Sequence, residues 1–177
     1  MTKREYEKVL LFMGILSVRG FPDALRKRLE AEFGPVDIIT EPFPFDYTDY
    51  YFQEMGEGIE RFFVSFSTLV FPDDLALIKE RTNSIEEEWM VDGGRSVNLD
   101  PGLLSYSSVI LATTKNRAHR IAIGRFLYAE LTLMYQGGLF VSFPWTYADY
   151  RSEKVEKELL RLRDRYKELR KLAENRA

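Results

Sequence analysis

A continuous apolar run near the start of the chain, VLLFMGIL at residues 9–16, constrains the fold more than any other stretch. It is too short to cross a bilayer, and no small-residue cleavage site of the kind that ends a leader peptide follows it. An apolar run of this length is typical of a strand that is buried on both faces. We therefore expect a central strand in a sheet that is covered on both sides.

Turn and capping signals divide the first hundred residues into two strand–helix–strand units. Pro22 and Asp23 open the first helix, and Gly34-Pro35 ends it, because Gly accepts the left-handed cap and Pro cannot continue a helix. Asp92-Gly93-Gly94 ends the second helix, and Asp100-Pro101-Gly102 is predicted to be the turn that follows the fourth strand. This order predicts an α+β, ferredoxin-like βαββαβ sandwich. The expected strands are 9–16, 36–41, 61–70 and 96–99, and the expected helices begin at Asp23 and at Phe71.

The rest of the chain is expected to extend this sandwich by a β-meander and a long C-terminal helix. Residues 107–115 fit a strand or a short helix, and we favour the helix, which Ser107 can cap. The meander comprises 120–124, 127–135 and 139–143, and alternation in its middle strand puts Leu127, Ala129, Leu131 and Leu133 on one face and Tyr128, Glu130, Thr132 and Met134 on the other. The helix spans Ser152 to about Glu174, with packing on the sheet favoured over a coiled-coil seam. We expect one domain over residues 1–177, with 151–175 as a helix packed on it.

Charge and composition narrow the class of protein. The chain has no cysteine, which excludes a disulfide framework and Cys-ligated zinc and fits a cytoplasmic protein; the high charge content suggests a heat-adapted source. The net charge is −3. Residues 151–177 hold ten basic and six acidic side chains, a net of +4, so the remaining part carries −7. This distribution argues against a general nucleic-acid-binding protein, whose body is normally basic.

Two aromatic segments share one pattern. PFPFDYTDYY at 42–51 and PWTYADYR at 144–151 both contain the frame Pro–aromatic–x–Tyr–x–Asp–Tyr. Proline stiffens such loops, and tyrosine combines a flat apolar ring with a polar tip. One interpretation is that both segments pack their rings on the sheet edge and only anchor the loops. The other is that they form two walls of a shared pocket.

Several blocks together resemble one known family. They are EPFPFDYTDYY with EMG, VNLDPG, LATTK, HRI, YAELTL and PWTYADYR, in this order. The sequence resembles the domain of unknown function 4416 family, stand-alone prokaryotic proteins of about this size, and the resemblance covers nearly the whole chain. Some members carry a GTP-binding label, but this chain has no glycine-rich phosphate loop that would support it. Ala148 stands where the family usually has Pro.

Four residues are candidates for catalysis: Asp46, Asp100, His119 and Glu130. Carboxylates with one imidazole suit a hard divalent cation such as Mg²⁺ or Mn²⁺, or general acid–base work if burial raises a pKa. Each has a structural alternative. Asp46, Asp49 and Asp100 can stabilise turns through Asx hydrogen bonds, and a single His beside Ile121 and Ile123 is more often a core residue than a catalyst.

The candidates for ligand binding are basic and aromatic. Lys115 and Arg120 lie in a basic cluster beside Thr113 and Thr114 that can hold a phosphate or carboxylate, or can simply be solvated surface. The full set is Tyr47, Asp49, Tyr50, Lys115, Arg120, Trp145 and Tyr147.

Three functions are compatible with this chain. We favour a small-molecule-binding protein or enzyme that takes a polar, anionic ligand such as a nucleotide or sugar phosphate, and it predicts that Asp46, Asp100, His119 and Arg120 converge in one cleft. The alternative is a non-enzymatic interaction or scaffold module that uses the aromatic loops and the C-terminal helix, and it predicts an exposed apolar stripe on that helix. In either case we expect a monomer or a homodimer. RNA binding on the sheet ranks last, because the strand 61–70 offers rings but little positive charge.

Overall fold

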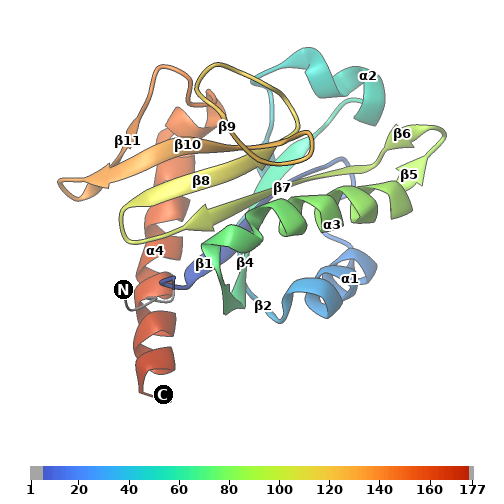
Figure 1. Cartoon of the computed structure of the whole chain (residues 1–177). Helices are drawn as coiled ribbons and strands as arrows, with labels where there is room; N and C mark the ends of the chain where they lie inside the picture. The colour runs from blue at the N-terminus through green and yellow to red at the C-terminus, as the bar shows by residue number, and fades with distance from the viewer. Residues whose placement is uncertain (1–5, 176–177) are drawn as a thin grey trace.

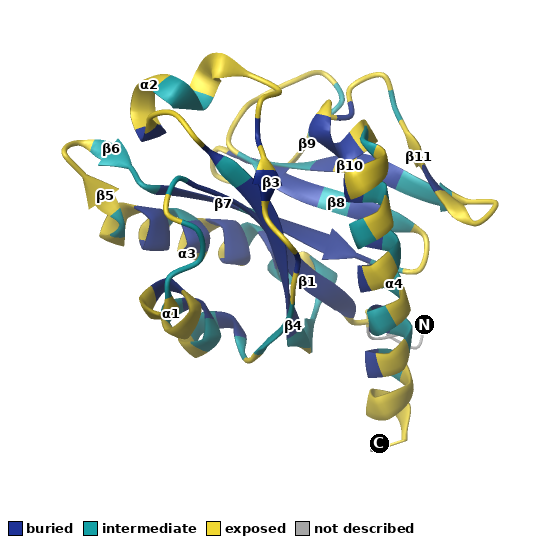
Figure 2. Ribbon diagram, turned by 180° about the vertical axis from the view of Figure 1, so that it is seen from behind, coloured by how far each residue is buried: buried dark blue, intermediate teal, exposed yellow. Residues whose placement is uncertain are grey.

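A large antiparallel sheet forms the centre of the computed structural model, which describes residues 6–175. Nine strands belong to this sheet, and its main path runs in the order β11-β10-β8-β7-β1-β4-β2. Helices α1 (Asp23–Phe33) and α3 (Leu75–Glu88) cover one face, and α4 (Glu153–Glu174) covers the other (Figures 1 and 2). The predicted α+β class with a long C-terminal helix is confirmed.

The apolar run forms the central strand, β1 (Val9–Ser17), in which every residue is buried. Its neighbours are β4 (Glu60–Val70) and β7 (Val97–Leu104), both antiparallel to it. Leu11 and Met13 point into the core that α1 and α3 close, while Leu10 and Phe12 point into the core that α4 closes. Burial on both faces therefore explains why the run shows no polar alternation.

The first half of the chain follows the predicted succession β1–α1–β2–β4–α3–β7, where β2 is Val36–Ile39. These strands lie in the order β7-β1-β4-β2, so each helix connects two strands that have one strand between them. A short strand, β3 (Phe43–Pro44), also pairs with β4. The ferredoxin-like assignment itself stays a prediction.

Four further strands extend the sheet, and two predictions about this region are wrong. The chain does not turn at Asp100-Pro101-Gly102, since β7 continues through these residues to Leu104. Residues 108–113 form a strand rather than a helix, because the buried Val109 and Leu111 continue the core that α4 closes. The added strands are β8 (Ser108–Thr113), β9 (Ile121–Gly124), β10 (Leu127–Gln136) and β11 (Leu139–Ser142).

The predicted face assignment of β10 is also wrong beyond its middle. A bulge interrupts its pairing with β8 between Leu131 and Leu133. Leu131 is exposed, whereas Glu130 and Thr132 are buried. Ala129 packs on the core that α1 and α3 close, but Leu133, after the bulge, is buried in the core that α4 closes. Glu130 precedes the bulge and lies opposite Leu111 of β8, so regular strand alternation brings its carboxylate into the protein interior.

The C-terminal helix begins as predicted, with Ser152 as its N-cap accepting from the Val155 backbone N–H. Leu172 is the one large apolar residue of its described part that is well exposed, so the helix offers no exposed apolar stripe to a partner. Five others are buried against the sheet: Val155, Leu159, Leu162, Tyr166 and Leu169. The remaining elements are short: η1 (Asp49–Tyr51), α2 (Phe52–Met55), η2 (Pro72–Asp74), β5 (Met90–Val91), β6 (Gly94–Arg95) and η3 (Asp149–Arg151).

Candidate functional site

The sheet opens between β7 and β8. β7 pairs with β1 along its full length, from Val97 to Leu104, but it pairs with β8 only from Gly102 to Leu104. On the N-terminal side of Gly102, the edge of β7 that faces β8 therefore has no strand beside it inside the protein. Such an edge needs other hydrogen-bonding partners, because buried backbone groups are costly to leave unpaired.

Two charged side chains of α3 supply these partners. The backbone N–H of Leu99 donates to Glu86 Oε1 at 2.6 Å, and its C=O accepts from Lys79 Nζ at 2.9 Å. In an antiparallel strand the N–H and C=O of one residue point to the same edge of the strand. For Leu99 this is the edge that faces β8, where β8 does not pair with β7. Lys79 and Glu86 thus replace a neighbouring strand, which explains why both are buried.

Proline in the middle of β7 fits the same opening. Pro101 lies two residues after Leu99 and so directs its backbone nitrogen to the same side. Proline has no N–H to donate. Proline at this position therefore leaves no backbone N–H without a partner where β8 does not pair with β7.

A cavity of about 420 Å³ lies at this opening, a size typical of small-molecule sites. Both aromatic segments line it, although about a hundred residues separate them. The first contributes Phe45, Tyr47, Thr48, Tyr50 and Tyr51, the second contributes Tyr147, Ala148, Asp149 and Tyr150, and the sheet and α3 add, among others, Arg61, Lys79, Asn98, Asp100, Thr113, Lys115 and Glu130.

Strand alternation explains why polar groups reach this cavity. On the face that α4 covers, the row Leu10–Phe12 of β1 continues to Gly14, and Phe63 of β4 is followed two residues away by Arg61. The apolar rows thus end in a small and a charged residue just beyond the core, and the cavity begins there.

Arg61 is a deeply buried charge of the site, with only 4% of its surface exposed. Its Nη2 lies 3.2 Å from Asp149 Oδ2 and 3.8 Å from Asp100 Oδ2. Its Nε and Nη1 have no hydrogen-bond partner among the described residues. The guanidinium lies 5.1 Å from the ring centre of Phe45 and packs where a Cβ of residue 14 would be, so Gly14 makes room for it.

Burial changes the acid–base properties of the groups around Arg61. Burial raises the pKa of Asp149, although the nearby Arg61 charge opposes this. Burial also raises the pKa of the hydroxyls of Tyr51, Tyr147 and Tyr150. These tyrosines therefore stay neutral at physiological pH, and Asp149 holds a proton more readily than an exposed carboxyl does.

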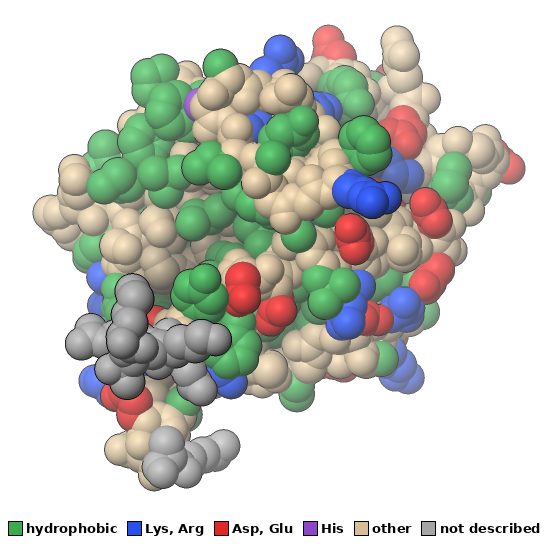
Figure 3. All heavy atoms as spheres, in the orientation of Figure 1, with side chains coloured by type: hydrophobic (Ala, Val, Ile, Leu, Met, Phe, Trp, Pro, Cys, Tyr) green, Lys and Arg blue, Asp and Glu red, His purple; other side chains and the backbone are tan. Residues whose placement is uncertain are grey.

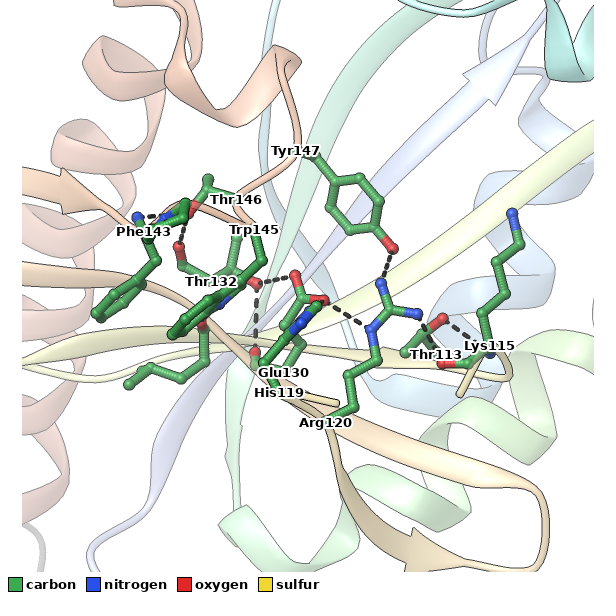
Figure 4. Close-up of polar contacts among 12 residues, drawn as sticks. Thr113, Lys115, His119, Arg120, Glu130, Thr132, Phe143, Trp145, Thr146 and Tyr147 are labelled. Atoms are coloured by element: carbon green, nitrogen blue, oxygen red, sulfur yellow. Dashed lines mark hydrogen bonds and ion pairs between the residues drawn. The ribbon is translucent and has the colours of Figure 1, made fainter. Parts of the chain in front are cut away.

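Glu130 is the centre of a second polar group, shown in Figure 4. Its Oε2 lies 2.8 Å from His119 Nε2 and accepts from Arg120 Nε at 2.7 Å. Arg120 also donates to the Tyr147 hydroxyl at 2.7 Å and to the Lys115 backbone oxygen at 2.6 Å. Arg120 thus ties the second aromatic segment to the end of β8.

His119 lies behind the cavity rather than in its wall. Its ring stacks on Trp145 at a centroid distance of 4.9 Å, and Trp145 stacks on Phe143 at 4.8 Å (Figure 4). The Trp145 indole N–H donates to the Leu131 backbone oxygen. His119 is neither sealed among aliphatic side chains nor in contact with the cavity, so its imidazole supports Glu130 from outside.

Lys115 lies at the mouth of the cavity. Its ammonium is 3.9 Å from the ring centre of Tyr50. Within residues 6–175 it forms no ion pair, unlike Arg61, Arg95 and Arg120, each of which has a carboxylate partner.

The predicted site residues therefore divide into three groups. Asp46 and Asp49 are exposed and do not line the cavity, and Thr48, not either aspartate, accepts from the Tyr50 backbone N–H. The predicted convergence of Asp46 with the other candidates is wrong, because its side chain follows the buried Phe45 on the outward face of the loop. In the wall lie Tyr47, Tyr50, Asp100, Lys115, Glu130 and Tyr147, and behind it lie His119, Arg120 and Trp145.

The residues that sequence reasoning missed carry recognisable signals. Lys79 and Glu86 stand seven apart on α3, each next to a buried isoleucine, where a helix stripe is expected to be apolar. Arg61 occupies the position of an apolar residue in the alternation of β4. A polar residue at a position that the pattern assigns to the core thus marks this site better than the turn signals do.

No group of three or more His, Asp or Glu side chains within the described part of the chain is placed to hold a metal ion. Between residues 6 and 175, no helix is long and apolar enough to span a membrane.

Comparison with known families identifies the chain. The family model described as Domain of unknown function (DUF4416) matches residues 7–166. The chain belongs to this family. Searches of the curated proteins and of the solved structures found no match. The family as named gives no activity, so the function of this DUF4416 member must be argued from its site.

Proposed function

We propose that this DUF4416 protein binds a small polar molecule with an anionic group, such as a nucleotide or a sugar phosphate, in the cavity between its two aromatic segments. The observation that carries the proposal is Lys115. It is a cation at the mouth of a cavity of ligand size, and it has no carboxylate partner among the described residues. A phosphate or carboxylate of a ligand supplies that partner.

The tyrosines of the two segments suit the remainder of such a ligand. Tyr47, Tyr50 and Tyr147 are each 40% or more exposed and line the cavity. Their rings can stack on a base or a sugar, and their hydroxyls can hydrogen-bond to it. The proposal requires no metal ion. It places a small molecule, not nucleic acid, in the cavity of a cytoplasmic protein.

A thermal-unfolding screen with inorganic phosphate, nucleotides and sugar phosphates tests this proposal. A ligand present at a hundred times its Kd adds about 2.7 kcal/mol of stability. Lys115→Ala should weaken binding of the responding ligand by roughly tenfold or more, because a hydrogen bond to a charged group contributes about 1.5–3 kcal/mol. Lys154→Ala is the matched control, since Lys154 also lies over an aromatic ring, that of Phe43, but outside the cavity.

Absence of any response to the screen would overturn the proposal and favour an interaction module. The surface that would then be relevant is not α4 but β9–β11, where hydrophobic side chains gather in Figure 3. Within residues 121–145, which contain these strands, six large hydrophobic side chains are exposed: Ile121, Phe126, Leu131, Leu139, Val141 and Trp145. Equal binding by Lys115→Ala and the unaltered protein would also contradict the assignment of the anion to Lys115.

A further inference from the structure

The cavity has two chemically different rims. On the β8 side lie the hydroxyls of Thr113 and Thr114 and the ammonium of Lys115. On the β7 side lie Asn98 and Asp100. The register that pairs Gly102 with Leu111, continued beyond the last pair, would put Asp100 opposite Thr113, so the two rims face each other across the opening.

Asp100 is the carboxylate on the β7 rim that a ligand can reach. Its side chain is 28% exposed, whereas that of Asp149 is 5% exposed. Its Oδ2 accepts from Asn98 Nδ2 at 2.8 Å and faces Arg61. No described residue donates to its Oδ1, so this oxygen is available to a donor in the cavity.

The groups behind Asp100 point to a ligand with hydrogen-bond donors. Arg61 is shared by two carboxylates, so the trio Arg61, Asp100 and Asp149 carries a net charge of −1 when both aspartates are ionised. The Tyr150 hydroxyl, which can donate or accept, is buried in the same wall without a hydrogen-bond partner among the described residues, and so are Arg61 Nε and Nη1, which can only donate. A hydroxyl group both donates and accepts, so it can serve Asp100 and these atoms alike. Buried polar atoms without partners are rare and need an explanation, and a polar ligand that completes this end of the site is one.

We propose that the β7 rim binds the hydroxyl groups of the ligand whose anionic group Lys115 binds, so that the cavity takes a phosphorylated polyol. This inference rests on the proposed function. It adds an orientation: phosphate toward Lys115 at the β8 rim, and hydroxyl donors toward Asp100 at the β7 rim. The polyol can be a free sugar or cyclitol phosphate, or the ribose phosphate of a nucleotide.

A matched pair of probes tests the orientation without altering the protein. Inositol monophosphate and cyclohexyl phosphate share a six-membered ring and a phosphate and differ in the ring hydroxyls. Calorimetric titration should show that inositol monophosphate binds at least tenfold more tightly than cyclohexyl phosphate. AMP, titrated in parallel, distinguishes a nucleotide from a free polyol phosphate as the better source of the same chemistry.

Two variants then assign the rims. Asp100→Asn should weaken binding of inositol monophosphate by at least tenfold and leave binding of cyclohexyl phosphate unchanged. Lys115→Ala should weaken binding of both probes. Circular dichroism and the unfolding midpoint show whether Asp100→Asn is folded; should it not be, the comparison of the two probes on the unaltered protein decides.

The outcomes separate the two proposals. If inositol monophosphate and cyclohexyl phosphate bind equally well and both depend on Lys115, the anion site stands and the polyol inference is overturned. If no phosphorylated probe binds the unaltered protein, the proposed function fails as well.

Discussion

Replacement of Glu86 tests whether a side chain of α3 takes the place of a strand beside β7. Glu86→Ala removes the oxygen that accepts from the Leu99 backbone N–H at 2.6 Å, and this N–H is buried. An unsatisfied buried donor costs about 1–3 kcal/mol, and each buried methylene that is lost adds about 0.8 kcal/mol. We expect Glu86→Ala to lower the free energy of unfolding by about 2–4 kcal/mol, a large share of a typical total of roughly 5–15 kcal/mol.

The amide variant separates the acceptor from the charge. Glu86→Gln keeps a side-chain oxygen for Leu99 and removes the negative charge. Burial raises the pKa of Glu86 and outweighs the attraction of Lys79 and of Arg95, whose Nη1 lies 3.0 Å from Glu86 Oε2, so loss of the charge also relieves a desolvation cost. We therefore expect Glu86→Gln to cost only about 1 kcal/mol or less, well below the loss of a buried hydrogen-bond partner.

Urea unfolding measures both effects, with Glu87→Ala as the control. Glu87 is the exposed neighbour of Glu86, and its replacement should change stability by only about 0.5 kcal/mol. The slope of the transition should stay constant, because the surface exposed on unfolding is unchanged. If Glu86→Ala were as harmless as Glu87→Ala, the missing-strand argument would be refuted. Equal damage from Glu86→Gln and Glu86→Ala would show that the charge opposite Lys79 matters, not the acceptor.

Two further predictions concern the buried cluster around Arg61. Gly14→Ala places a Cβ 2.4 Å from Arg61 Nη1, so it should cost about 1–3 kcal/mol in urea unfolding; a neutral result would show that the guanidinium moves freely. Asp149 has a raised pKa in the folded protein, so its contribution to stability increases as pH falls from neutral toward the ordinary value of 3.8. Asp149→Asn should remove that increase from the pH profile of the urea midpoint, and an unchanged profile would contradict it.

Much of the fold follows from local patterns that the tertiary structure does not override. The apolar run of β1, the Gly34 cap of α1 and the Ser152 cap of α4 each give the element that their chemistry favours. The exceptions lie where a local signal competes with burial. Asp100-Pro101-Gly102 has the composition of a turn, but pairing with β1 keeps it extended, and Ser107 can cap a helix, but Val109 and Leu111 gain more by joining the sheet core.

The cavity could be predicted only in part, because tertiary structure and not local sequence decides which side chains reach it. Composition identified the two aromatic segments, and the structure places both beside one cavity. Composition could not identify which carboxylates reach the cavity, because that depends on strand register, which places Glu130 opposite Leu111 with its side chain buried. Asp46 and Asp100 are equally polar in the sequence, yet one lies on an exposed loop and the other on an inner strand.

The separation of β7 from β8 connects these observations. In a sheet that stayed closed, Asp100 would pair with β8 as well as with Gly14 of β1, and no space would remain beside it. Pro101 removes a donor on that side, and Lys79 and Glu86 satisfy the backbone of Leu99, so the two strands can diverge without leaving the Leu99 N–H and C=O unpaired. Lys79 and Glu86 of α3 thus belong to the site because they position β7, and we assign them no contact with a ligand. A change at Glu86 should therefore reach the cavity through the position of β7 and through Arg95, a lining residue that pairs with Glu86 and with Glu54 of α2.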